Sequence, residues 1–146
     1  METRYFEDFD VGETITTTAR TITEADLVNY AGLSGNFDPI HLDAETMAES
    51  EFGGRVVYGY LVLAVMEGQK VQTGMIEGSV KAFYGFDGAR FTNPVLVGDT
   101  IHTEITVLDL EDRGDGGIVV LEEKAVNQDG EPVVVAETRT LFHKRE

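Results

Sequence analysis

The 146-residue sequence contains no cysteine and no tryptophan. Without cysteine the chain has no disulfide, no thiolate nucleophile and no thiolate zinc site, and a reducing compartment is expected. Long apolar runs are also lacking: the longest, VVYGYLVLAVM at 56–66, is far shorter than the roughly 20 residues that a transmembrane helix needs. The N-terminal stretch METRYFEDFD has neither the basic nor the apolar region of a signal peptide. These absences predict a cytoplasmic protein with no membrane partner.

Basic residues are scarce. Only 11 Lys and Arg stand against 27 Asp and Glu, which gives a net charge of −16 and an isoelectric point near 4.4. Nucleic acid is therefore excluded as an expected partner, because phosphate binding requires clustered Lys and Arg. The acidic residues are spread along the chain, a pattern that suggests a solvated anionic surface suited to high salt. A halophilic protein is one hypothesis, and an ordinary acidic protein is the alternative.

The chain is expected to form a single domain over residues 1–146, since no repeat, linker or low-complexity tract divides it. A strand is predicted at 13–22, followed by a helix that Thr21 or Thr23 can cap, with Glu24 at capping-box spacing from Thr21. Asp43 can cap a further short helix. The segment 55–75 is apolar almost all round, which predicts a helix buried on every side.

From residue 79 onward the apolar residues alternate with a period of two, as in strands. Four such segments lie at 79–86, 88–112, 116–128 and 131–144. Turn signals stand at 113–117 and at Asp129-Gly130. A long antiparallel sheet after one buried helix predicts an α+β fold with the sheet curled around the helix. Periodicity alone does not distinguish an enzyme from a binding module.

The loop LSGNFDPIHLD at 33–43 gathers Asn36, Asp38 and His41 around a proline. A carboxylate or an imidazole can accept a proton, whereas a neutral amide cannot. Gly, Asn, Asp and Pro are also the usual residues of tight turns, so a plain turn is the alternative interpretation. Asp38, His41 and Asp43 make a weak metal signal because no second cluster of ligands accompanies them. We expect no metal and no cofactor.

Three motifs in order resemble those of the MaoC-like dehydratases, the family of R-specific enoyl-CoA hydratases. YAGLSGNFDPIH (30–41) is similar to the family's catalytic loop, YGYL (58–61) to the start of its central helix, and RFTNPVLVGDTI (90–101) to a later strand turn. The resemblance implies the α+β hot-dog fold, a curled antiparallel sheet around one long central helix. It also implies reversible addition of water to a trans-2-enoyl-CoA, without a cofactor, in a homodimer or higher homo-oligomer with the site at the subunit interface.

In this family the loop Asp and His hold and activate water, which points to His41 here. Gly59 matches the glycine whose backbone N–H stabilises the thioester oxygen, and Tyr58 replaces a family histidine, where it either lines the pocket or packs. The family order Asp-x-Asn is exchanged here to Asn36-Phe37-Asp38. Three interpretations follow: Asp38 takes the role of base and Asn36 orients the water, or His41 works alone, or the scaffold binds an acyl thioester without hydrating it.

Two other functions stay open on the same fold. In an acyl-CoA thioesterase a carboxylate would direct water at the carbonyl carbon instead of the β-carbon, and in a non-catalytic acyl-CoA-binding protein the substitution at Asn36 would have removed catalysis. Release of free thiol would identify the thioesterase. Tight binding without hydration or thiol release would identify the binding protein.

Overall fold

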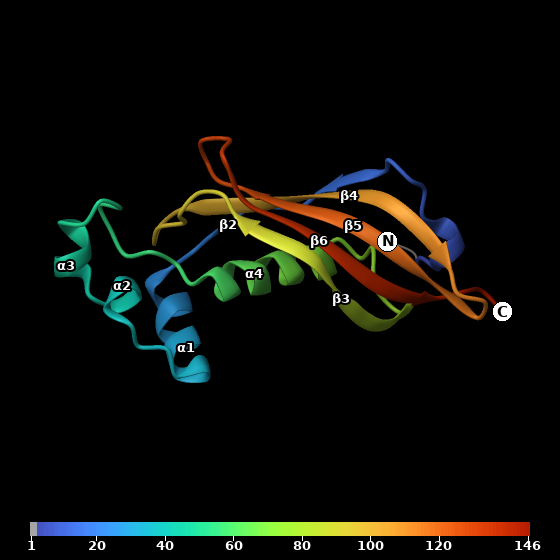
Figure 1. The fold of residues 1–146 in the computed structure, drawn as a ribbon, viewed down its shortest axis with the longest axis horizontal. Coiled ribbons are helices and arrows are strands. Elements are labelled where there is room, and N and C mark those ends of the chain that lie inside the picture. The colour runs from blue at the N-terminus through green and yellow to red at the C-terminus, as the bar shows by residue number, and fades with distance from the viewer. Residues whose placement is uncertain (1–2) are drawn as a thin grey trace.

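The computed structural model describes residues 3–146 and shows a long sheet with one helix beneath it and three short helices at one end (Figure 1). Among the described residues, no helix is both long enough and apolar enough to cross a membrane. In chain order the elements are η1 (Phe6–Asp8), β1 (Thr14–Thr16), β2 (Arg20–Thr21), α1 (Glu24–Ser34), α2 (Pro39–Leu42), α3 (Ala44–Ala48), α4 (Gly59–Gln72), β3 (Val80–Phe91), β4 (Thr100–Asp112), β5 (Gly116–Val126) and β6 (Pro132–His143).

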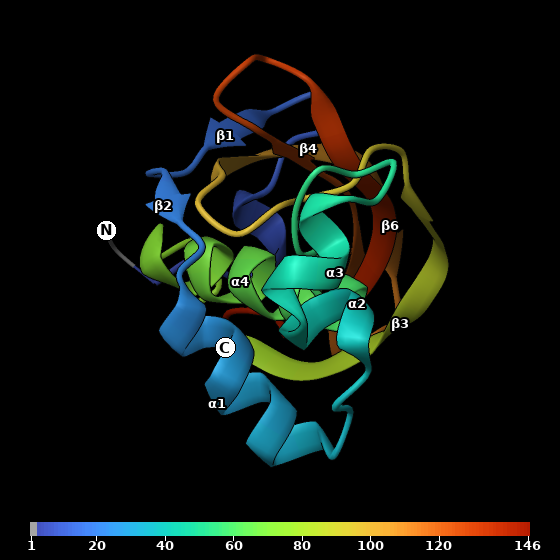
Figure 2. The same cartoon turned by 90° about the vertical axis from the view of Figure 1, so that its left-hand side faces the viewer.

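The sheet is antiparallel, with the strand order β1-β4-β5-β6-β3 and with β2 also paired to β4. Both predicted hairpins are confirmed, since β4 joins β5 and β5 joins β6 through short turns. Viewed from the helical end, β4, β6 and β3 curve around α4 (Figure 2). The predicted α+β fold, a curled antiparallel sheet around one central helix, is therefore confirmed.

Two details of the N-terminal half differ from the prediction or complete it. The prediction of a single strand at 13–22 was wrong, since β1 and β2 are separate strands. They are separate because the backbone N–H of Thr103 bonds to the side-chain oxygen of Thr17 at 2.8 Å instead of to a backbone carbonyl. Of the two candidate caps of α1, Thr23 is the one used. Asp26, not Glu24, completes the capping box with it.

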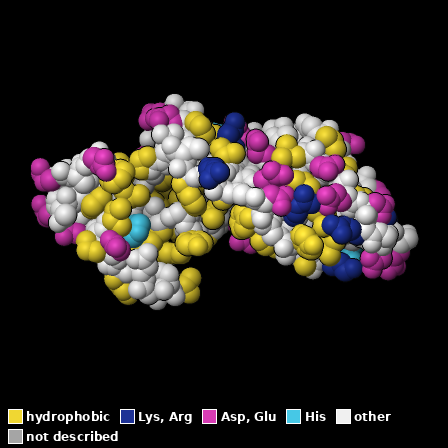
Figure 3. Space-filling view, in the orientation of Figure 1, with side chains coloured by type: hydrophobic (Ala, Val, Ile, Leu, Met, Phe, Trp, Pro, Cys, Tyr) yellow, Lys and Arg dark blue, Asp and Glu magenta, His cyan; other side chains and the backbone are white. Residues whose placement is uncertain are grey.

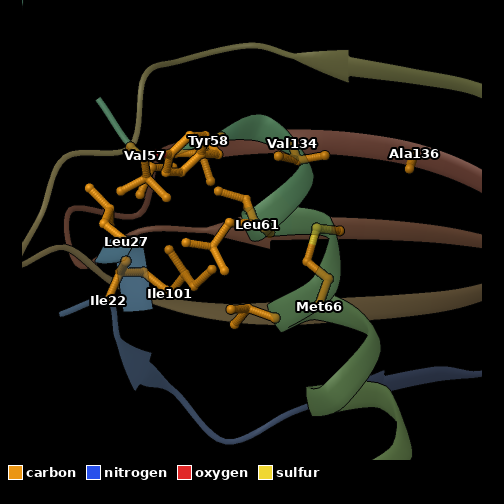
Figure 4. Packing of buried hydrophobic residues seen from close by; sticks show 14 of the residues in the cluster. Ile22, Leu27, Val57, Tyr58, Leu61, Met66, Ile101, Val134 and Ala136 are labelled. Carbon is orange, nitrogen blue, oxygen red and sulfur yellow. The ribbon is translucent and has the colours of Figure 1, made fainter. Parts of the chain in front are cut away.

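The central helix α4 is not buried on every side, and that prediction was wrong. Leu61, Val62, Val65 and Met66 belong to one buried cluster with residues of the sheet. Figure 4 shows Leu61 and Met66 on α4 beside the strands. Tyr60, in contrast, is 77 % exposed, and Val71 is half exposed. A sheet of one chain covers only the side of a helix that faces it, so an apolar face of α4 remains uncovered.

The excess of acid persists in the folded chain. Within residues 3–146, every Lys and Arg other than Arg90 lies within ion-pair distance of an Asp or Glu. Acidic side chains show on both ends of the visible surface (Figure 3). The remaining carboxylates therefore repel one another, and within residues 3–146 only Arg90 is left among the Lys and Arg to neutralise them.

We expect the melting temperature to rise with added KCl, because salt screens this repulsion to a range of about 10 Å at 0.1 M. Thermal unfolding followed by circular dichroism from dilute buffer to molar KCl would measure the effect. A melting temperature that stays constant or falls over this range would contradict the halophilic hypothesis.

Candidate active site

The loop between α1 and α2 is a chain of local turns. Helix α1 ends at Gly35, whose φ of 79° is left-handed and suits glycine. The side-chain oxygen of Asn36 accepts the N–H of Asp38 at 3.1 Å, and the Asp38 carboxylate accepts the N–H of Ile40 at 3.0 Å. Asp38 thereby caps α2, with Pro39 at its first position. The turn interpretation of the loop is correct for its backbone, and both side chains remain exposed.

His41 is held by a backbone carbonyl. Its Nδ1 lies 2.6 Å from the oxygen of Val56, an acceptor only, so Nδ1 carries the hydrogen of the neutral ring and Nε2 keeps a lone pair. Val56 is itself fixed, because its N–H donates to the carbonyl of Ile40 at 3.1 Å and it bridges to Leu96. The protein thus selects the tautomer of His41 that can accept a proton at Nε2.

Tyr58 lies against the histidine. Its ring stacks on the His41 ring, with 3.8 Å between the ring centroids. The ring of Tyr30 lies at a tilt to it, with 4.5 Å between the centroids. Its hydroxyl donates to the carbonyl oxygen of Asn36 at 2.7 Å, which ties the loop to the base of α4. Burial raises the pKa of the Tyr58 phenol, and Tyr30 and Asp38 raise it further. Tyr58 therefore packs and positions the loop and His41.

Gly59 is the first residue of α4, where backbone N–H groups have no partner within the helix and the helix dipole is positive. A Cβ on Gly59 would lie 2.8 Å from the ring of Phe91, so any side chain here would require that ring to shift. The close approach of this ring explains why the position is glycine. It leaves the N–H groups at the helix start available to an oxygen with developing negative charge.

A cavity of about 190 Å³ brings His41 and Gly59 together. Its other walls come from the residues before α4, from Val62, from the end of β3 and the loop after it, and from the start of β6: Val56, Val57, Val62, Phe91, Asn93, Pro94, Val95, Val133 and Val134. Asn36 and Asp38 do not line it. They stand beside it on the exposed loop, joined to it through Tyr58.

Sequence reasoning missed several of these residues. Phe91, Asn93 and Pro94 belong to the motif RFTNPV. This motif supported the family resemblance, but no role in the site was assigned to its residues. The carbonyl of Val56, which sets the tautomer of His41, carried no sequence signal because a backbone group has none. The two other histidines stand outside this site: His102 lies beside Glu104 at 3.6 Å, and His143 is exposed at the end of β6.

No group of three or more His, Asp or Glu side chains suited to a metal ion occurs in residues 3–146. Asp43 is engaged elsewhere, since its carboxylate caps α3 by accepting the N–H of Thr46 at 3.0 Å. The hydrogen bond from Thr46 to this carboxylate holds the pKa of Asp43 below its ordinary value. The chemistry that the arrangement offers is proton transfer at an imidazole beside unpaired backbone donors.

The chain is similar to several known proteins. The family model described as "MaoC like domain" matches residues 8–129. "Protein MaoC" of Klebsiella aerogenes is 44 % identical over 103 residues, which cover 70 % of the chain but only 30 % of that protein. "3-hydroxyacyl-thioester dehydratase Z" of Mycobacterium tuberculosis is 30 % identical and covers 81 % of the chain and 80 % of its own length.

A third relative, the "(R)-specific enoyl-CoA hydratase" of Rhodospirillum rubrum, is 31 % identical over 73 % of the chain and 71 % of that protein. Among solved structures, one titled "Monoamine oxidase regulatory protein" from Archaeoglobus has a TM-score of 0.90 at 34 % identity, covering 99 % of this chain and 97 % of that one. Relatives named as hydratases or dehydratases and a relative named as a regulator therefore share this fold.

Proposed function

The chain belongs to the MaoC-like domain family, whose members include hydratases and dehydratases, and we propose that it adds water reversibly across the double bond of a trans-2-enoyl-CoA. One observation carries the proposal: an imidazole whose accepting tautomer is fixed by the Val56 carbonyl shares a small cavity with Gly59, whose backbone N–H at the start of α4 has no hydrogen-bond partner within residues 3–146. This pairing provides both a proton acceptor and a site for the thioester oxygen.

In the proposed reaction, water loses a proton as its oxygen adds to the β-carbon. Negative charge moves to the thioester oxygen, where the Gly59 N–H stabilises it, and the α-carbon then takes a proton. The proton that water loses reaches Nε2 of His41 by way of the Asp38 carboxylate, and His41 then delivers it to the α-carbon, so that both groups return to their starting states. The Asp38 carboxylate acts as the water-activating base, and Asn36 orients the water. One Asp38 oxygen caps α2, and within residues 3–146 the other has no hydrogen-bond donor, which leaves it for water.

The direct test is turnover of a short trans-2-enoyl-CoA, followed by loss of the absorbance of the conjugated thioester, in low and in high salt. Loss of this absorbance without release of free thiol would support hydration. Release of free thiol would identify a thioesterase. Tight binding of the thioester with neither change would identify a non-catalytic acyl-CoA-binding protein, the function that the amide at Asn36 favours.

The same proposal includes a homodimer, because β3 and α4 leave a large apolar surface uncovered. Within the described residues β3 pairs only with β6, so its other edge is free. Phe83, Tyr84, Phe86 and Phe91 are each at least half exposed on this edge strand, and Tyr60 of α4 is exposed as well. An unpaired apolar edge is a template for another strand, and a second copy offers the same edge in matching form.

Tyr84→Glu is therefore expected to shift the protein from dimer to monomer, since it places a charge in the middle of the proposed interface. Sedimentation in molar KCl would measure the mass. Val11→Glu is the matched control, because Val11 is similarly exposed but precedes β1 at the other edge of the sheet. Equal masses for wild type and both variants would contradict a dimer through β3.

A further inference from the structure

The sheet face beneath α4 is apolar at both ends and polar in the middle. One hydrophobic cluster surrounds the start of α4, and another lies under the end of the helix with Met75, Leu121 and Phe142. Between them stand buried polar side chains from both the helix and the sheet: Gln69, Lys70, Thr103, Glu123, Thr138 and Thr140. A domain of this size does not need a polar layer across its core, so the layer itself calls for an explanation.

An ion pair forms the centre of this layer. Lys70 Nζ lies 2.9 Å from Glu123 Oε2, and the two residues are 5 % and 3 % exposed. The hydroxyl of Thr138 donates to the same carboxylate oxygen at 2.5 Å. Burying two charges costs several kcal/mol of desolvation per ion, which their attraction commonly does no more than offset. A gain in fold stability therefore does not explain why this ion pair is buried.

Thr140 adds a second, independent observation. Its residue is only 4 % exposed, and within residues 3–146 its hydroxyl is the one fully buried side-chain polar atom without a hydrogen-bond partner. Buried polar atoms almost always have a partner, so an orphaned hydroxyl points to a missing one. Lys70 also has spare donors, since its ammonium carries three hydrogens and donates to Glu123 alone among the described residues.

These groups line one side of a cavity of about 410 Å³ between α4 and the strands β3 and β6. Its other walls are mostly apolar, from Leu63, Met66, Phe83 and Phe86, with Glu67 as a further acidic lining residue. Lys70, Glu123, Thr138 and Thr140 are all lining residues, so the residue that carries the orphaned hydroxyl stands in the same wall as the ion pair. The cavity therefore offers apolar walls and a short row of hydrogen-bond donors.

This cavity lies next to the one at His41 along β6, although none of the described residues lines both. On β6, Val134 lines the first cavity, and Ala136 and Thr138, which follow at alternate positions, line the second; Figure 4 shows Val134 and Ala136 in succession along a strand beside α4. The facing residues of β3 follow the same order, since Phe91 pairs with Val134 and Phe86 with Thr138.

Distance along α4 agrees with a single extended ligand. Lys70 follows Gly59 by 11 residues, or about 16 Å at 1.5 Å per residue. The long side chain of a helical lysine leans back toward the helix start, which shortens the gap. A chain whose thioester oxygen sits at Gly59 can therefore extend along α4 to the polar row.

We propose that this second cavity binds the distal part of the acyl chain and recognises a neutral oxygen on it, a hydroxyl or a ketone, through Thr140 and Lys70. The inference rests on the proposed acyl-CoA function. A neutral group fits better than a carboxylate because Glu123 already balances the charge of Lys70, and an added anion would be buried without a counter-charge. A plain hydrocarbon tail would leave the Thr140 hydroxyl unpaired.

The test compares trans-2-enoyl-CoA thioesters of short to long chain, each in plain, ω-hydroxy and ω-carboxy form. At the chain length that reaches the polar row, we expect kcat/KM for the ω-hydroxy form to exceed that for the plain form about 10-fold or more. Thr140→Val should remove this preference and leave turnover of short plain substrates unchanged, because it replaces the hydroxyl by a methyl group of similar size at a position that short substrates do not reach. Thr106→Val, on β4 away from this cavity, is the control and should keep the preference.

If the wild type hydrates short substrates and uses the plain or the ω-carboxy form as well as or better than the ω-hydroxy form at every length, the inference is overturned. The hydratase proposal then still stands. Retention of the preference in Thr140→Val would also overturn it. If no substrate is hydrated, calorimetry with saturated ω-hydroxyacyl-CoA and plain acyl-CoA decides. Tighter binding of the hydroxylated form by wild type but not by Thr140→Val supports the inference, and equal binding overturns it.

Discussion

Replacement of His41 by alanine is expected to lower turnover of a short trans-2-enoyl-CoA about 10²-fold or more, the usual contribution of a positioned acid-base group. An imidazole can accept and donate a proton near neutral pH, and the Val56 carbonyl holds this one in its accepting tautomer. The substitution also removes the ring that stacks on Tyr58. Steady-state hydration rates for both proteins, in the salt that best stabilises them, would measure the loss.

His102→Ala is the matched control, because that histidine lies on the sheet beside Glu104 and away from the cavity. Its rate should equal that of wild type. Circular dichroism should show that His41→Ala keeps the native secondary structure, so that loss of rate reports chemistry. A folded His41→Ala protein with the wild-type rate would remove this histidine from the mechanism.

The parts of this fold that local sequence governs were predictable. Asp43 caps a helix, Thr23 is one of two candidates for another cap, and the turn at Asp129-Gly130 joins two strands, all because neighbouring residues along the chain decide these features. The loop residues Asn36, Asp38 and His41 could be selected by their resemblance to a known motif. Their grouping around Tyr58 depends on contacts over some 20 positions of sequence.

Features that depend on distant segments were not predictable. The exposure of Tyr60 follows from where the sheet ends, and apolar periodicity alone does not reveal which face of α4 the sheet covers. The approach of Phe91 to Gly59 joins β3 to α4. Lys70 and Glu123 are polar residues within apolar patterns, where sequence alone would place them in solvent. Such departures from pattern are expected at functional or strained sites.

The exchange of Asn36 and Asp38 gives the sharpest test of the mechanism. If the carboxylate of Asp38 activates water, Asp38→Asn should lower hydration about 10²- to 10⁴-fold. Asparagine caps a helix as well as aspartate does, so the substitution removes the charge while α2 keeps its start. Asp43→Asn is the matched control: it makes the same chemical change at the cap of α3 and should leave the rate unaltered.

The reciprocal variants separate the three interpretations of the loop. Asn36→Asp alone adds a second carboxylate close to Asp38, and because like charges repel we expect little gain in rate. The double exchange, Asn36→Asp with Asp38→Asn, restores the family order and should be active if the base can act from either position. Unchanged hydration by Asp38→Asn would leave His41 acting without a carboxylate. The wild type could bind acyl-CoA without hydrating the enoyl-CoA, while the double-exchange variant hydrates it. This result would show that the order of these two residues separates a binding protein from an enzyme.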